Sequence, residues 1–254
     1  QVEHWVSEAP ATARALAMKF WPGPLTMIFQ RAARVLDAVT GGQDTVAIRV
    51  PSHPVAQALL KAFGGGVVAP SANRFGHVSP TTARHVREEF GEDVSCILDG
   101  GACEVGIEST IIDVSGAPPA ILRPGWINAH DIEAVLGMPL AAPSRHSPRA
   151  SGTLEKHYAP RTPLMLVEAD LIYELAASLM RQGQRVAVLA RTARLPLLAT
   201  LIWREAPADA AGYAHALYAN LRALDDGAAD VIIVETPPVA LPWAAIQDRL
   251  TRAA

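Results

Sequence analysis

Five short segments combine glycine, proline, hydroxyl and arginine side chains in patterns that ordinary surface turns do not require. Hydroxyl and amide groups can hold the polar parts of a substrate, and a guanidinium can neutralise a carboxylate or a phosphate. The chain offers no convincing Ser-His-Asp or Cys-His set, so we assign no catalytic nucleophile. The segments are 19–26 (KFWPGPLT), 45–51 (TVAIRVP), 69–80 (APSANRFGHVSP), 106–110 (GIEST) and 122–125 (LRPG).

Thr45 and Arg49 stand four positions apart in an alternating segment that is typical of a β-strand. An even separation points both side chains to the same face of a strand. A guanidinium beside a hydroxyl suits a ligand with a carboxylate and phosphates, because Arg binds a carboxylate through two parallel hydrogen bonds. The alternative is a plain surface arginine on an edge strand, and the pattern leaves it open.

Ser71 and Asn73 follow an apolar run, 67–69, which we expect to be a short buried strand. Ligands of α/β proteins gather at the carboxyl ends of strands, so these side chains are candidates for polar contacts. The same residues also suit an ordinary turn. Ser79 before Pro80 is an expected helix N-cap, although such a helix start also attracts anions.

The apolar periodicity predicts two α/β regions joined by a linker. Segment 141–163 is rich in proline and serine and has almost no large apolar residues, which is typical of an exposed linker or lid. The continuous apolar runs 186–190 and 231–234 indicate parallel strands covered on both faces. We therefore set the domains at 1–140, 141–162 and 163–254. Further strands are expected at 25–29, 45–50, 96–98, 109–114, 120–122 and 164–167, and helices at 8–20, 55–63, 81–90, 128–136, 171–179, 213–224 and 243–250.

Composition narrows the class of protein. The chain has 254 residues, of which 50% are hydrophobic and 19% charged, with a net charge of -3. These values support one large core or two modest ones and argue against a polybasic or a disordered chain.

Neither a membrane-spanning run nor a signal peptide is apparent, so we expect a cytoplasmic protein. Cys96 and Cys103 lack a matching Cys/His set, and we predict two small, nearly buried thiols and no bound structural metal.

In this order, the five segments resemble the YrdC-like threonylcarbamoyl-AMP synthase family. Residues 157–160 (HYAP) and 248–254 (DRLTRAA) are similar to the long version, which has an extra C-terminal domain. The resemblance covers essentially the whole chain. It implies a twisted, open, mixed YrdC-like sheet with helices, followed by a smaller Rossmann-like α/β domain.

The resemblance also implies the reaction and the residues that serve it. L-Threonine, bicarbonate and ATP with Mg²⁺ would give threonylcarbamoyl-AMP and pyrophosphate, for threonylcarbamoyladenosine formation in tRNA. The chemistry needs positioning and charge neutralisation. Because carbamates hydrolyse easily, we hypothesise that 141–163 forms a lid that excludes water. The threonine contacts implied are Arg49, Ala69 and Ser109, and the ATP contacts are Thr45, Ser71, Ser79, Arg123 and Tyr158.

The match departs from the family at its start. Family members carry a Lys-x-Arg pair and further threonine-pocket residues before the position that matches Gln1. Lys19, Lys61 and Lys156 form no such pair. We therefore expect the chain to be truncated at its start and its synthase activity to be impaired.

The main alternative is an RNA-binding or interaction protein with a YrdC-like domain and no catalysis. The net charge of -3 argues against strong nonspecific electrostatic binding of RNA, so direct tRNA binding is expected to be weak. A carbamoyl-transfer domain of a larger enzyme is a further alternative, against which the linker and second α/β region argue. The tRNA threonylcarbamoyl-transfer machinery is an expected partner, and a membrane is not. Arginines that could serve RNA binding are Arg31, Arg34, Arg49, Arg74, Arg84, Arg87 and Arg123.

Overall fold

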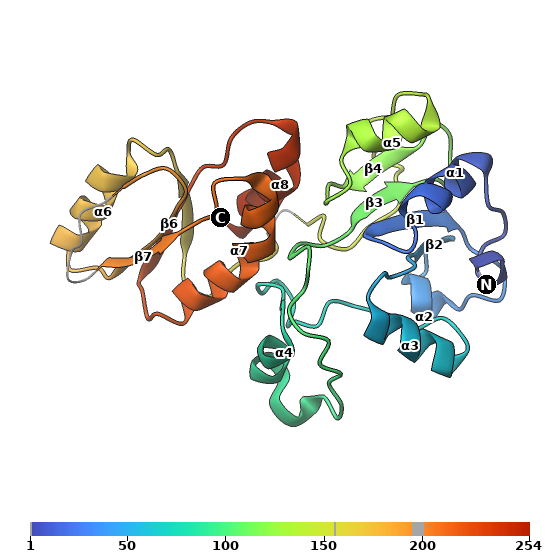
Figure 1. Ribbon diagram of the computed structural model, residues 1–254, viewed down its shortest axis with the longest axis horizontal. Helices are drawn as coiled ribbons and strands as arrows, with labels where there is room; N and C mark the ends of the chain where they lie inside the picture. Colours follow the sequence, from blue (N-terminus) through green and yellow to red (C-terminus); the bar gives the residue numbers. More distant parts are fainter. Residues whose placement is uncertain (1, 155, 195–200) are drawn as a thin grey trace. The chain divides into compact units, whose positions relative to one another are not determined.

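The protein is described by a computed structural model that covers residues 2–154, 156–194 and 201–254 (Figure 1). The chain divides into two compact units. The first unit joins Gln1–Pro70 to Glu108–Thr153, and the second joins Ser71–Ile107 to Leu154–Ala254. Each unit has its own sheet and core.

The first unit contains a mixed, open four-stranded sheet of order β2-β1-β3-β4. Its strands are β1 (Leu25–Gln30), β2 (Thr45–Ile48), β3 (Thr110–Asp113) and β4 (Ala120–Arg123). The two outer pairs, β1–β2 and β3–β4, are antiparallel, and the central pair, β1–β3, is parallel. This sheet agrees with the open, mixed sheet that the family resemblance implies.

The core of the first unit lies between the sheet and two helices, α1 (Ala11–Phe20) and α5 (Ala129–Leu136), which pack against each other. Leu16 of α1 and Ile132 of α5 are fully buried in the same cluster as Met27 of the central strand. Alternate residues of β1 enter this cluster because side chains on a strand point to opposite faces in turn. Figure 1 shows both helices over the sheet. The unit also contains η1 (Val2–His4), α2 (Asp37–Thr40) and α3 (Pro54–Phe63).

Helix α3 begins and ends where local sequence signals place it. Pro54 occupies the first turn, where a missing N–H costs nothing, and His53 caps the helix by accepting from the Val55 amide. Gly64 ends the helix in the left-handed conformation, with φ 76°, which glycine adopts without steric cost. The predicted helix at 55–63 is confirmed.

The second unit contains a parallel sheet of order β5-β8-β6-β7. Its strands are β5 (Leu164–Val167), β6 (Val186–Ala190), β7 (Leu201–Glu205) and β8 (Val231–Glu235). Every residue of β6 and β8 is buried, as expected for strands covered on both faces. The predicted doubly wound α/β arrangement is confirmed.

Helices cover the two faces of this sheet separately. Val186 and Val188 share a cluster with residues of α6 (Ile172–Arg181). Ala187 and Leu189 lie in another cluster, with residues of α7 (Ala210–Asp225) and α8 (Ala244–Ala253). The alternation along β6 therefore assigns α6 to one face and α7 with α8 to the other. The short helix η3 (Leu241–Trp243) precedes α8.

Segment Ser71–Ile107 belongs to the second unit, whereas the sequence-based boundaries put it in a domain of residues 1–140. It carries α4 (Ala83–Phe90) and η2 (Gly91–Asp93). Val78 is buried in the cluster that contains the α7 residues, and Ile107 packs against that cluster. His215 Nδ1 of α7 lies 2.8 Å from the main-chain oxygen of Glu104. These contacts hold the segment to the C-terminal sheet's helices.

The expectations for two strands and for the cysteines are wrong. Segments 67–69 and 96–98 are not strands, and Val67 and Val68 are 49% and 63% exposed. An apolar run becomes a strand only beside another strand, and none of the described strands pairs with either segment. Cys96 and Cys103 are exposed rather than nearly buried, because the chain around them lies outside both sheets. In the part of the chain that the structure describes, no helix is both long and apolar enough to cross a bilayer.

Candidate functional site

Four strand ends of the first unit meet at one edge of its sheet, the edge at which β1 and β3 begin and β2 and β4 end. Leu25, at the start of β1, pairs with Thr110, at the start of β3. Ile48 ends β2 opposite Met27, and Arg123 ends β4 opposite Ile111. Polar residues that lie at or just beyond these ends are therefore brought together, although they are distant in sequence.

Ser109, immediately before β3, is the centre of this edge. Its side-chain oxygen lies 2.7 Å from the Thr26 hydroxyl of β1 and accepts from Arg123 Nη2 at 3.3 Å. Arg123 also donates to the Ser109 main-chain oxygen, from Nη2 at 2.9 Å and from Nε at 3.2 Å. Ser109 and Arg123 are only 5% and 7% exposed. The structure thus unites two of the predicted site residues and adds Thr26.

Nearby main chain is packed closely around this cluster. A Cβ on Gly125 would lie 2.3 Å from the Thr110 amide nitrogen and 2.7 Å from the Ser109 carbonyl carbon. The Thr110 hydroxyl donates to Ile127 O at 2.7 Å and accepts from the Ile127 amide at 3.1 Å. Glycine after Pro124 therefore lets the chain beyond β4 run against the start of β3.

Arg49 lies one residue beyond β2 and is exposed. Its Nε donates to the main-chain oxygen of Gly23 at 3.0 Å, and the Gly23 amide donates to Val50 O at 2.8 Å. This pair of bonds fixes the Pro22–Gly23–Pro24 turn beside the end of β2. A guanidinium can bind a carboxylate through paired hydrogen bonds.

Thr45 lies at the other end of β2, opposite Gln30. Four residues of extended chain span about 13 Å, so the structure does not bring Thr45 next to Arg49. Ala69 is exposed and lies outside any helix or strand. The predicted contacts of Thr45 with ATP and of Ala69 with threonine stay predictions.

The remaining predicted ATP contacts, Ser71, Ser79 and Tyr158, lie in the second unit. Ser71 is exposed and Ser79 is 8% exposed. The expectation that Ser79 caps a helix is wrong. Helix α4 begins at Ala83, and Thr82 caps it by accepting from the His85 amide at 3.2 Å.

Tyr158 is buried, whereas the sequence predicts an exposed linker or lid there. Only 1% of it is exposed, its ring stacks on Tyr218 with centroids 5.8 Å apart, and Arg249 Cζ lies 5.1 Å from the ring centre. Its φ of 63° is uncommon for a residue with a side chain. The structure therefore places Tyr158 in the core of the second unit, and the predicted nucleotide contact remains untested.

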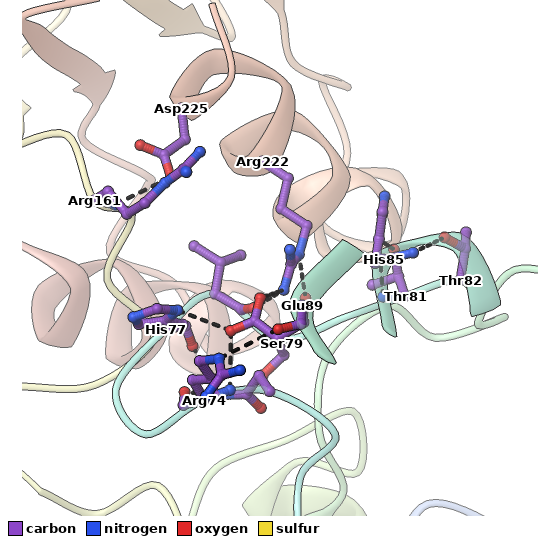
Figure 2. A network of polar contacts seen from close by, with 12 residues as sticks. Arg74, His77, Ser79, Thr81, Thr82, His85, Glu89, Arg161, Arg222 and Asp225 are labelled. Carbon is purple, nitrogen blue, oxygen red and sulfur yellow. Dashed lines mark hydrogen bonds and ion pairs between the residues drawn. The ribbon is translucent and has the colours of Figure 1, made fainter. Parts of the chain in front are cut away.

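A buried carboxylate organises the segment that carries Ser79 (Figure 2). Glu89 of α4 accepts from the Arg74 amide at 2.9 Å, lies 2.8 Å from His77 Nδ1, and pairs with Arg222 of α7 at 3.2 Å. Burial alone would raise the pKa of Glu89, but the bonds from Arg74, Arg222 and His77 outweigh it and hold the pKa below its usual value. Glu89 is therefore ionised at neutral pH.

Sequence reasoning missed Thr26, Glu89 and Arg222. Thr26 lies within the first of the five segments, so its presence was a usable signal. Glu89 and Arg222 carry no local pattern that separates them from other charged residues of amphipathic helices, and only the tertiary contacts reveal them.

Several of the arginines considered for RNA binding are in ion pairs. Arg31 pairs with Asp37 and Asp44, Arg74 with Asp93, and Arg84 with Glu88. Paired guanidinium groups contribute less positive field to a polyanion. Among the described residues, no three His, Cys, Asp or Glu side chains gather into a metal site.

These features define a two-domain class of α/β protein, in which a mixed sheet with a Ser–Arg cluster at one edge accompanies a doubly wound parallel sheet. Two family models match the chain: one described as "Telomere recombination" over residues 1–125, and one described as "Threonylcarbamoyl-AMP synthase, C-terminal domain" over residues 127–254. The chain belongs to the threonylcarbamoyl-AMP synthase family. The resemblance seen in the sequence is confirmed.

Relatives and a solved structure agree with this membership. The threonylcarbamoyl-AMP synthase of Bacillus subtilis is 36% identical over 100% of the chain and 76% of its own length. That of Pyrococcus abyssi is 39% identical over 74% of the chain, and the match covers 59% of that protein. The structure of P. abyssi Sua5 complexed with L-threonine superposes with a TM-score of 0.91, at 34% identity, over 100% of the chain and 76% of that structure.

Proposed function

We propose that the protein forms threonylcarbamoyl-AMP and pyrophosphate from L-threonine, bicarbonate and ATP. The observation that carries the proposal is the cluster of Thr26, Ser109 and Arg123 at one edge of the mixed sheet. A buried serine hydroxyl, bonded to a half-buried threonine hydroxyl and lying beside a buried guanidinium, suits a small polar, anionic substrate. The complex of P. abyssi Sua5 with L-threonine supports the choice of threonine.

Arg49 would bind the threonine carboxylate. Its Nε bond to Gly23 O orients the guanidinium plane, and a planar fork recognises a carboxylate through paired hydrogen bonds. Ser109 would hold the polar side of threonine, with the Thr26 hydroxyl fixing its orientation. The amine of threonine would then form a carbamate, either with bicarbonate and loss of water or with carbon dioxide and loss of a proton.

Arg123 would stabilise negative charge as a carbamate oxygen attacks the α-phosphate of ATP and pyrophosphate leaves. A preoriented charge of this kind costs little reorganisation at the moment of reaction. Magnesium would arrive with ATP, held by the phosphate oxygens, and would supply further charge neutralisation. Thr45, Ser71, Ser79 and Tyr158 are proposed to contact the nucleotide on the strength of the family resemblance.

We further propose that the product serves threonylcarbamoyladenosine formation in tRNA in the cytoplasm, through the protein machinery that transfers the threonylcarbamoyl group. The reactive adenylate requires an acceptor, and a protein acceptor complex would shield it from water. The direct test of the proposed activity is pyrophosphate release from Mg-ATP, measured with and without threonine and bicarbonate. Pyrophosphate release that does not depend on threonine, or does not depend on bicarbonate, would disprove the proposal.

A further inference from the structure

Arg222 of helix α7, in the second unit, holds the main chain of Val78 and Ser79. Its Nη2 donates to Val78 O at 2.5 Å, and its Nε donates to Ser79 O at 3.4 Å. The same Nη2 pairs with Glu89 Oε2 at 3.2 Å. One rigid guanidinium thus reaches two carbonyls and a carboxylate (Figure 2), which a lysine ammonium with its single nitrogen could not do in the same geometry.

Glu89 ties the other side of the same segment to this guanidinium. Its Oε1 accepts from the Arg74 amide and lies against His77 Nδ1, while Oε2 faces Arg222. Residues 74 to 79 are therefore held at both ends by one ion pair. The side chains of Glu89 and Arg222 are only 8% and 15% exposed, so solvent screens this pair weakly.

Burial fixes the segment further. Val78 and Ser79 are 4% and 8% exposed, and Val78 shares a core cluster with Leu217 and Leu221 of α7. The side chain of Val78 is in the core, and Arg222 bonds to the main-chain oxygens of Val78 and Ser79. The backbone at Ser79 therefore has little freedom. The conformation of Ser79 consequently depends on a residue more than a hundred positions later in the chain.

We propose that Arg222 is a positioning residue for nucleotide binding, which acts by fixing the backbone at Ser79. This inference rests on the proposed function, in which Ser79 contacts ATP. It gives the C-terminal domain a defined role in the reaction: its helix α7 supports the ATP-binding segment and not the threonine contacts at Ser109 and Arg49. A loss of Arg222 would then weaken ATP use selectively.

The test is a comparison of KM values for ATP and for threonine in the full chain and in Arg222→Gln and Arg222→Lys. We expect the KM for ATP to rise roughly ten- to a hundredfold in Arg222→Gln, because small displacements of a positioning group have effects of this size. Arg222→Lys keeps a charge for Glu89 but loses the fork, so its effect should be intermediate. The KM for threonine should change less than about twofold.

The matched control is Arg185→Gln, which removes an exposed ion pair with Asp230 in the same unit and should leave both KM values unchanged. Hydrogen exchange of residues 74 to 82 supplies a readout that does not depend on turnover. Exchange should be faster in Arg222→Gln, and ATP should slow it less than in the unmodified protein. Circular dichroism melting checks that each variant is folded, and Arg222→Lys carries the test if Arg222→Gln unfolds.

Three outcomes would count against the inference. An unchanged KM for ATP in a folded Arg222→Gln variant overturns it while leaving the proposed function intact. An equal rise in both KM values shows that Arg222 only stabilises the fold, which also overturns it. An unmodified protein that neither releases pyrophosphate nor shows ATP-dependent protection refutes the proposed function itself, and the inference with it.

Discussion

Arg123 and Ser109 are joined by two hydrogen bonds to a single main-chain oxygen, from Nη2 at 2.9 Å and Nε at 3.2 Å. The bonds connect the end of β4 to the residue before β3. Arg123 Nη1 additionally donates to Ser151 O at 3.0 Å, which ties residues beyond the first unit's last helix to the same guanidinium. A nearly buried positive charge is thereby held in one orientation beside the Ser109 hydroxyl.

Replacing Arg123 by lysine should impair both the fold and the reaction. A lysine keeps the charge but cannot donate twice to Ser109 O and once to Ser151 O, so the free energy of unfolding should fall by about 1–3 kcal/mol. Urea denaturation measures this loss, and pyrophosphate release should fall in parallel. Arg185→Lys, at an exposed pair, should change stability by less than about 0.5 kcal/mol. Equal stability of the two variants would contradict the structural account.

The Thr26–Ser109 hydroxyl pair should show energetic coupling. Thr26→Val and Ser109→Ala each remove one partner of the 2.7 Å contact, and the double variant removes both. We expect a coupling of about 1 kcal/mol in a double-mutant cycle of unfolding free energies. Ser109→Ala should also raise the KM for threonine more than the KM for ATP. Additive stabilities would show that the two hydroxyls act independently.

Gly125→Ala should be strongly destabilising because the new methyl group would collide with main-chain atoms at the start of β3. Overpacking against backbone typically costs about 1–3 kcal/mol, and here it also displaces Ser109. Gly116→Ala is the matched control, since a Cβ there meets nothing within 4 Å. Thermal melting of both variants separates the two cases, and a harmless Gly125→Ala would refute the close approach described here.

His85 should make the second unit less stable in mild acid. Desolvation, with repulsion from Arg222 and Arg84, lowers the pKa of His85 below its usual 6.5. The unfolded chain then takes up a proton more readily than the folded protein, so stability is lost as pH falls below about 6.5. Protonation would also break the bond that Nδ1 accepts from the Thr81 amide.

The measurement is urea denaturation between about pH 7.5 and about pH 5.5 for the unmodified protein, His85→Gln and His130→Gln. The dependence on pH should weaken in His85→Gln and persist in His130→Gln, because His130 is exposed. The lowered pKa of Glu89 acts in a separate window, below its usual 4.5, where stability is lost as that carboxylate is protonated. Identical pH profiles in all three proteins would rule out the role given to His85.

Local sequence signals were enough to predict many of the strands and helices. The uninterrupted apolar runs of β6 and β8 predict parallel strands buried on both faces, and proline and glycine predict the ends of α3. Residues 67–69 carry the same apolar signal as a strand, yet none of the described strands pairs with them. Strand β7 was missed because its last two residues are polar and exposed.

The site was partly predictable for the same reason. Ser109 and Arg123 stand in short segments whose residue types already suggest polar chemistry, and the register of the sheet brings them together. The dependence of Ser79 on Arg222 could not be predicted, because it arises from one side chain that reaches across the fold. The grouping of Ser71–Ile107 with the C-terminal sheet is likewise a tertiary property with no local sequence signal.

Pyrophosphate release from Mg-ATP is the decisive measurement of the proposed activity. The release should require both threonine and bicarbonate, yield threonylcarbamoyl-AMP detectable by mass spectrometry, and fall sharply in Arg123→Lys. Pyrophosphate release that is independent of threonine or bicarbonate, or the absence of threonylcarbamoyl-AMP among the products, would contradict it.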